Sequence, residues 1–222
     1  MQTEVADSFK TIQDKLGETP STFVFPEDKS TPETLKYVLG LHLVARDHES
    51  LFHTYNRLLI PVYGGKRFSI ATGRLLIDIA MARRLWLIPQ GHGLYSTLVK
   101  KSFKSISAEL LKDQLNYLRE NENKIWVARF IDAYKYLKER KETKINIEKS
   151  DKNEVTFSLM NNLNQTIYSY PLTVIINTAP VQPVRAYTVD KTNKKKIPIR
   201  IVGNKIFLEV SPSGQSIRVK WQ

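Results

Sequence analysis

The hydrophobic pattern of this 222-residue chain changes period near residue 142, and that change constrains the fold more than any other feature. Before residue 142, segments with apolar residues at helical spacing alternate with short apolar runs typical of strands. After residue 142 the pattern alternates with period two, and turn residues recur about every ten positions. This order predicts an α/β region followed by an all-β region that forms an antiparallel β-sandwich. We therefore expect two domains, residues 1–141 and residues 142–222.

Within the first region, the alternation of helices and strands favours a parallel sheet. Helices are expected at 1–16, 30–39, 70–84, 107–118 and 132–140. Strands are expected at 22–26, 41–46, 85–92 and 125–127. Residues 47–68 are expected to be irregular. In the second region, strands are expected at 144–148, 155–160, 172–177, 184–189, 197–202, 205–210 and 216–221.

Composition excludes several classes of site. The chain has no cysteine, so it can form neither a disulfide framework nor a thiolate metal site. No run approaches the roughly 18 consecutive apolar residues that a membrane span requires. The first residues lack the basic and apolar regions of a secretory signal, so none is expected.

The formal charge is +12 and is divided evenly between the two predicted domains. Its densest run is Lys191–Lys196, which lies between two predicted strands. A solvated turn is the expected role of this run, and attraction to an anionic polymer is the alternative. No helix-turn-helix, zinc finger or aromatic RNA-binding motif accompanies it, so no specific nucleic-acid partner is expected.

The segment from Leu85 to Gly93 is typical of a buried strand that runs into a glycine-rich turn. This turn contains His92. An imidazole at the carboxyl end of a barrel strand is well placed for catalysis. A core or loop histidine without a chemical role is the alternative.

Several motifs, taken in order, resemble the C-terminal half of a polysaccharide deacetylase of the NodB-homology family. The segment from Thr22 to Pro26 resembles the family's aromatic-proline segment, and Leu43–Arg46 resembles the strand that follows it. The resemblance continues through Trp86–Gly93, Ile106–Leu111, Leu118–Phe130 and Tyr136–Arg140. The predicted sandwich resembles the small β domain of some bacterial members, so the resemblance covers nearly the whole chain.

This resemblance implies a partial (β/α) barrel, a polysaccharide substrate and an extracellular or periplasmic location. In that family a divalent metal such as zinc assists hydrolysis of the N-acetyl amide of amino sugars. By resemblance, His92 is the general acid, and Pro26 and Arg46 are substrate-binding residues. A surface ion pair is the alternative role of Arg46. Glu27 and Asp28 stand where the family usually has an aromatic residue and glycine, which weakens the expectation of a groove wall.

The metal ligands of the family come from an Asp-Asp pair and a His-x-x-x-His motif, and this sequence has neither. His42, His48 and His53 lack the i, i+4 spacing that places two imidazoles together on a helix. Asp47, His48 and Glu49 are adjacent and are expected to be polar loop residues. We therefore expect that the chain alone binds no metal and is inactive.

Three explanations remain open: a fragment of a longer enzyme, a degenerate relative that binds glycans without cutting them, and one half of an assembly with a separate N-terminal chain. Charge-driven adhesion is a further alternative. Trp86 and Trp126 lie in apolar runs and are expected in the core rather than on a sugar-binding surface.

Overall fold

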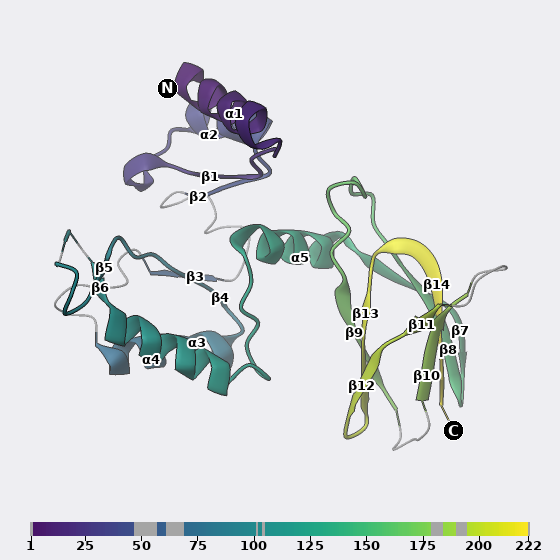
Figure 1. Cartoon of the computed structure of the whole chain (residues 1–222). Helices are drawn as coiled ribbons and strands as arrows, with labels where there is room; N and C mark the ends of the chain where they lie inside the picture. The colour runs from purple at the N-terminus through teal and green to yellow at the C-terminus, as the bar shows by residue number, and fades with distance from the viewer. Residues whose placement is uncertain are drawn as a thin grey trace. The chain divides into compact units, whose positions relative to one another are not determined.

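A computed structural model describes residues 2–46, 57–60, 69–100, 102–103, 105–178, 184–189 and 195–221. The chain forms two compact units, Met1–Ala128 (unit 1) and Arg129–Gln222 (unit 2) (Figure 1). The change of period predicts a boundary at residue 142, whereas the units divide after Ala128. The helix before residue 142 therefore belongs to unit 2, where Tyr136 packs against the core. The interpretation of the units as half of a deacetylase barrel and an accessory β domain stays a prediction.

Unit 1 is a mixed α/β structure. Its elements are α1 (Gln2–Leu16), β1 (Thr22–Val24), η1 (Pro26–Asp28), α2 (Pro32–Leu41), β2 (Val44–Arg46), β3 (Arg57–Ile60), α3 (Ile70–Arg83), β4 (Trp86–Pro89), β5 (Leu94–Tyr95), β6 (Ile106–Ser107) and α4 (Ala108–Glu120). The strands form three parallel pairs, β1 with β2, β3 with β4 and β5 with β6. Parallel pairing requires a crossover, which α2 supplies for the first pair and α3 for the second. The described strands form no closed barrel, so the predicted deacetylase-type barrel is not confirmed.

Local capping explains where the helices begin. The Ser107 hydroxyl accepts a hydrogen bond from the Leu110 amide at 3.1 Å, which confirms the predicted start of α4. Thr31 and Thr34 form a reciprocal capping box at the start of α2. This helix continues through Gly40 to Leu41, so the expected end at residue 39 is wrong. One glycine costs only about 1 kcal/mol in a helix.

Two other local expectations are wrong. Residues 57–60 were expected to be irregular, but Arg57–Ile60 forms β3 because it pairs with β4. The expected strand at 125–127 is absent, since the Asn121 carbonyl accepts from the Ile125 amide at 3.0 Å in a turn after α4. Trp126 is consequently 51% exposed rather than in the core, and Trp86 is half-buried.

Small apolar clusters hold unit 1 together. One cluster joins Val5 of α1 and Val38 of α2 with Phe25 and Ala45 near the first strand pair. The helices α3 and α4 lie side by side (Figure 1). Their closest approach depends on Gly73, since a Cβ there would lie 2.5 Å from the buried side chain of Gln114.

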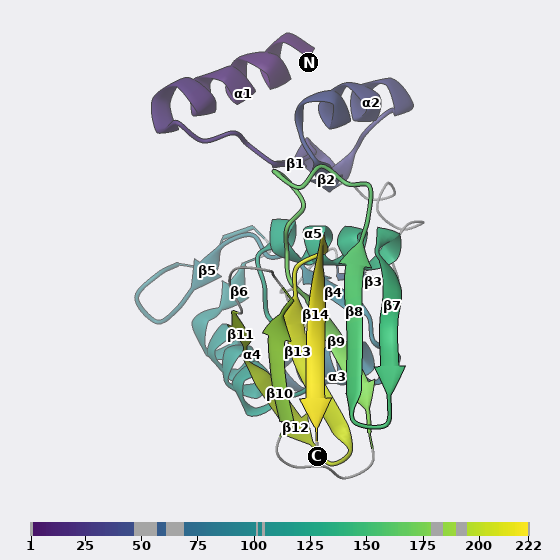
Figure 2. The ribbon, with the colours of Figure 1, turned by 90° about the vertical axis from the view of Figure 1, so that its right-hand side faces the viewer.

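The described residues of unit 2 form one helix and two antiparallel sheets (Figure 2). Its elements are α5 (Phe130–Glu142), β7 (Lys144–Asp151), β8 (Glu154–Met160), β9 (Leu172–Asn177), β10 (Val184–Thr188), β11 (Lys196–Ile197), β12 (Ile199–Val202), β13 (Lys205–Val210) and β14 (Ser213–Trp221). The strand orders are β11-β10-β14-β8-β7 and β12-β13-β9. Phe157 and Val219 of the five-stranded sheet share one core with Ile206 and Leu208 of the three-stranded sheet. The predicted antiparallel sheets are therefore present, and they pack as a sandwich.

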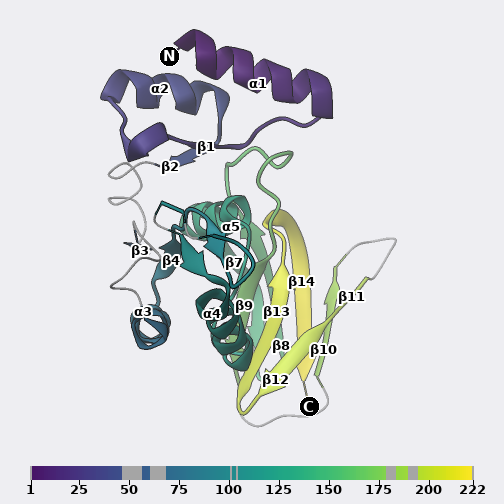
Figure 3. The same cartoon turned by 60° about the vertical axis from the view of Figure 1, so that its left-hand side comes forward.

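The strand predicted at 197–202 is divided at Pro198. The residues before it, in β11, pair with β10, and the residues after it, in β12, pair with β13 in the other sheet. Proline has no N–H to donate to a ladder, so the pairing stops there and the chain passes from one sheet to the other (Figure 3).

Candidate functional site

The predicted site residues of unit 1 lie at the carboxyl ends of its parallel strands. Arg46 is the last residue of β2 and is in register with Val24, the last residue of β1. Pro26 lies two residues after Val24, and its side chain is exposed. The Phe25 amide donates to the Arg46 carbonyl at 3.0 Å, which fixes Pro26 and Arg46 at the same edge.

A hydrogen bond links this edge to the turn that contains His92. The Arg46 guanidinium donates through Nη1 to Gln90 Oε1 at 2.6 Å. Gln90 directly follows β4, and His92 lies two residues further on, with its side chain exposed. The structure therefore brings Arg46 to the start of the His92 turn. None of the described contacts of His92 joins it directly to Arg46 or Pro26.

The His92 ring instead contacts an aromatic side chain from the loop between β5 and β6. The ring centroids of His92 and Phe103 lie 5.3 Å apart at an interplanar angle of 73°, an edge-to-face arrangement. Phe103 is 71% exposed. The loop can approach because a Cβ at Gly93 would lie only 2.7 Å from Ser102 Oγ.

Gln90 and Phe103 were missed by sequence reasoning. Gln90 carried one usable signal: extended residues two apart share a face, so a polar side chain two positions before His92 could be placed beside it. Phe103 carried none, because its contact with His92 depends on how the loop returns.

The turn after β1 holds a non-glycine residue in an unusual backbone conformation. Glu27 has a φ of 54°, in the left-handed region that glycine adopts without steric cost. Its carboxylate pairs with Lys29 Nζ at 3.0 Å on the surface. The backbone of Glu27, next to Pro26, is therefore strained. The role of Pro26 in substrate binding stays a prediction.

The described residues do not fit the divalent metal of the deacetylase family. No group of three or more His, Asp or Glu side chains among them could hold an ion. His42 is buried, and its Nδ1 donates to the Pro20 carbonyl at 3.0 Å. Burial lowers the pKa of His42, so it is a neutral core residue between α1 and β1. The predicted loop residues Asp47, His48, Glu49 and His53 lie outside the described part of the chain.

Comparison with known proteins gives one weak match. No family model matches the chain. A gellan lyase from a Bacillus species is 24% identical over 120 residues, a stretch that covers 50% of this chain and 5% of that protein. The match thus spans about one twentieth of the length of the curated relative. No described helix has the length and apolar character needed to cross a bilayer.

Proposed function

We propose that this chain contributes polysaccharide binding to a larger carbohydrate-active protein, through the strand edge that carries Pro26, Arg46, Gln90 and His92. The observation that carries the proposal is the Arg46–Gln90 hydrogen bond, which ties the ends of two separate parallel strand pairs together. Support also comes from the similarity to a gellan lyase, a protein that acts on a polysaccharide.

The chemistry of this edge suits a ligand rich in hydroxyl groups. A guanidinium offers five N–H donors in a planar fork, a primary amide both donates and accepts, and an imidazole has two ring nitrogens that form hydrogen bonds. Phe103 adds an exposed ring beside His92, and an aromatic ring of this kind can pack against the apolar face of a sugar.

A matched pair of arginine variants tests the proposal. Binding of the full chain to dextran, a neutral glucan, and to polygalacturonate is measured by affinity electrophoresis. We expect Arg46→Gln to weaken binding to at least one of them about tenfold, because the variant removes a charged donor from the edge. Arg83→Gln makes the same change at an exposed position of α3 and should leave binding unchanged. Equal binding by both variants would exclude this edge as the binding site.

Deacetylation by a completed enzyme is the second candidate. It is favoured by the position of His92, exposed just beyond the carboxyl end of β4. On this proposal a missing N-terminal half supplies the Asp-Asp and His-x-x-x-His motifs and their zinc-like metal, and the location is extracellular or periplasmic. His92 then protonates the leaving amine nitrogen.

Acetate release from an N-acetylated oligosaccharide tests this candidate. The chain is mixed with zinc and a separately expressed deacetylase N-terminal half. Acetate release that His92→Asn abolishes would support the candidate. Release that is unaffected by this variant, or no release at all, would contradict it.

A further inference from the structure

The positive charge of the chain is concentrated on unit 2 when the structural boundary is used. Residues 129–222 contain 17 Lys and Arg against 8 Asp and Glu, a formal charge of +9 of the total +12. The remaining residues, 1–128, therefore carry +3. A binding surface for an anion is accordingly sought on unit 2.

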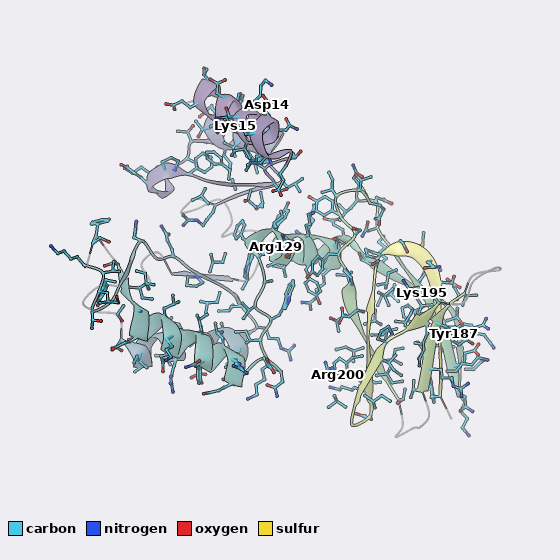
Figure 4. The ribbon with its side chains drawn as sticks, in the orientation of Figure 1. Asp14, Lys15, Arg129, Tyr187, Lys195 and Arg200 are labelled. Atoms are coloured by element: carbon cyan, nitrogen blue, oxygen red, sulfur yellow. The ribbon has the colours of Figure 1, made fainter. Side chains whose placement is uncertain are left out.

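Strand register places several of these cations on the outer face of the five-stranded sheet. Ile217 and Val219 of β14 point into the core, so Arg218 and Lys220 lie on the opposite face. Arg185 and Tyr187 of β10 share that face, because Ala186 between them is in the core. Tyr187 is in register with Arg218 on one side and with Lys196 of β11 on the other. Tyr187 is thus flanked by cations on both neighbouring strands, and Lys195 lies in the same part of unit 2 (Figure 4).

Like charges oppose one another on this face. Arg185 is the register partner of Lys220, and both side chains are exposed. Like charges directly opposite on adjacent strands destabilise a sheet. A bound anion between them would convert this repulsion into attraction.

The described acidic residues near this face, Glu148, Asp151 and Glu154, lie on β7 and β8, whereas β10 and β11 contain none. Three cations converge on the single carboxylate of Glu154: Lys220 at 2.8 Å, Lys149 at 3.3 Å and Arg218 at 3.6 Å. The hydrogen bond from Lys220 is the largest cause of a lowered pKa of Glu154, so this carboxylate is ionised at neutral pH. Lys149 also pairs with Asp151. Even so, the Arg185 end of the face retains a surplus of positive charge.

We propose that the outer face of the five-stranded sheet, centred on Tyr187 with Arg185, Lys196, Arg218 and Lys220, binds an acidic polysaccharide. The half-buried tyrosine ring offers a surface for a sugar ring, and Arg185 and Lys196, at the end of the face away from Glu154, receive the carboxylates of the polymer. Cations on the two strands that flank β10 are separated by about two strand spacings, roughly 10 Å, which suits a polymer with repeated negative charges. The choice of a polysaccharide among polyanions rests on the proposed function.

The test compares sheet variants in the full chain, with polygalacturonate as the probe and dextran as the neutral polymer. We expect Arg185→Gln and Tyr187→Ala each to weaken polygalacturonate binding about tenfold at low salt, with dextran binding unchanged. The control, Lys205→Gln, makes an equal change of charge on β13 in the other sheet and should bind as the wild type does. Thermal unfolding checks that each variant is folded. Arg185 is exposed, so its replacement gives a readable result even if Tyr187→Ala does not fold.

Each of the following results would overturn the inference. Undiminished polygalacturonate binding by Arg185→Gln shows that the anion binds elsewhere. An equal loss in Lys205→Gln shows that net charge alone attracts the polymer. Tighter binding of single-stranded oligothymidylate than of polygalacturonate, lost in the same variants, assigns the face to nucleic acid. Loss through Arg46→Gln with the sheet variants intact contradicts only this inference, whereas a wild type that binds no polysaccharide contradicts the proposed function as well.

Discussion

Glu139 is the most unusual single residue, because a carboxyl group is fully buried where α5 meets the sandwich. Its Oε1 accepts a hydrogen bond from the Tyr170 amide at 2.8 Å. Among the described residues, no hydrogen-bond donor reaches its Oε2. Burial raises the pKa of Glu139 above its ordinary value, since the charged form loses its hydration, although the Tyr170 amide opposes part of this effect.

A raised pKa makes the stability of unit 2 depend on pH. Below the ordinary glutamate pKa, near 4.5, the carboxyl is protonated in both the folded and unfolded states. As the pH rises, the unfolded state ionises first, so the folded state loses stability until the pH passes its own raised pKa. We expect Glu139→Gln, which keeps the acceptor for Tyr170, to lose less stability between pH 4 and pH 8 than the wild type.

Urea unfolding at several pH values, with hydrogen exchange of β9 amides as the readout of unit 2, measures this difference. Glu142→Gln makes the same change at an exposed position of the same helix and should follow the wild type. Identical pH profiles for the wild type and Glu139→Gln would show that the buried carboxyl does not control the pH dependence.

For single residues, the sequence predicts where a residue lies along a strand or helix better than it predicts which residues that residue contacts. The placement of Arg46 at a strand end and of His92 just beyond a strand follows from local hydrophobic pattern, and both are observed. The bond of Arg46 to Gln90 joins residues 44 positions apart, so it depends on tertiary structure that no local pattern encodes. The burial of Glu139 was missed for the same reason: a glutamate in a basic helix is normally exposed.

At the scale of elements, the end of α3 carries a strained cap. Arg84 follows the helix with φ and ψ of 53° and 49°, in the left-handed conformation. Its amide donates to the carbonyls of Ala80 and Met81, which closes the last turn. Glycine usually occupies this position, because a side chain there costs about 1 kcal/mol or more.

Replacing each of these two adjacent arginines by glycine is therefore expected to have opposite effects on stability. We expect Arg84→Gly to stabilise unit 1 by about 1 kcal/mol, because it relieves the left-handed strain. Arg83→Gly lies inside the helix and should destabilise it by about 1 kcal/mol. Urea unfolding, followed by hydrogen exchange of α3 amides, measures both. Destabilisation by both variants would show that the cap is not strained.

Elements with a local sequence signal could be predicted, and elements that depend on tertiary pairing could not. The start of α4 at Ser107 and most strands of unit 2 were predicted, because caps and period-two patterns are local. The strand β3 was not predicted, because its only described partner is β4, and four residues show no clear period. The division of one predicted strand at Pro198 had a visible signal in the missing N–H of proline.

At the scale of the whole molecule, the two proposed binding surfaces lie on two units of different character. Unit 1 offers a polar strand edge with an exposed ring, and unit 2 offers a cationic sheet face. Neither surface, as described, requires a metal ion. The boundary predicted at residue 142 assigns the basic helix α5 to the first domain, so the two predicted domains carry equal charge. With the structural boundary, unit 2 carries most of the positive charge. The central proposal is polysaccharide binding at these two surfaces, independent of a metal ion.

Equilibrium binding of the full chain to polygalacturonate and dextran, in EDTA and at low salt, tests this claim most directly. We predict that the chain binds at least one polymer with an affinity that chelation does not change. Binding that disappears in EDTA and returns with zinc, or no binding to either polymer, would contradict the claim.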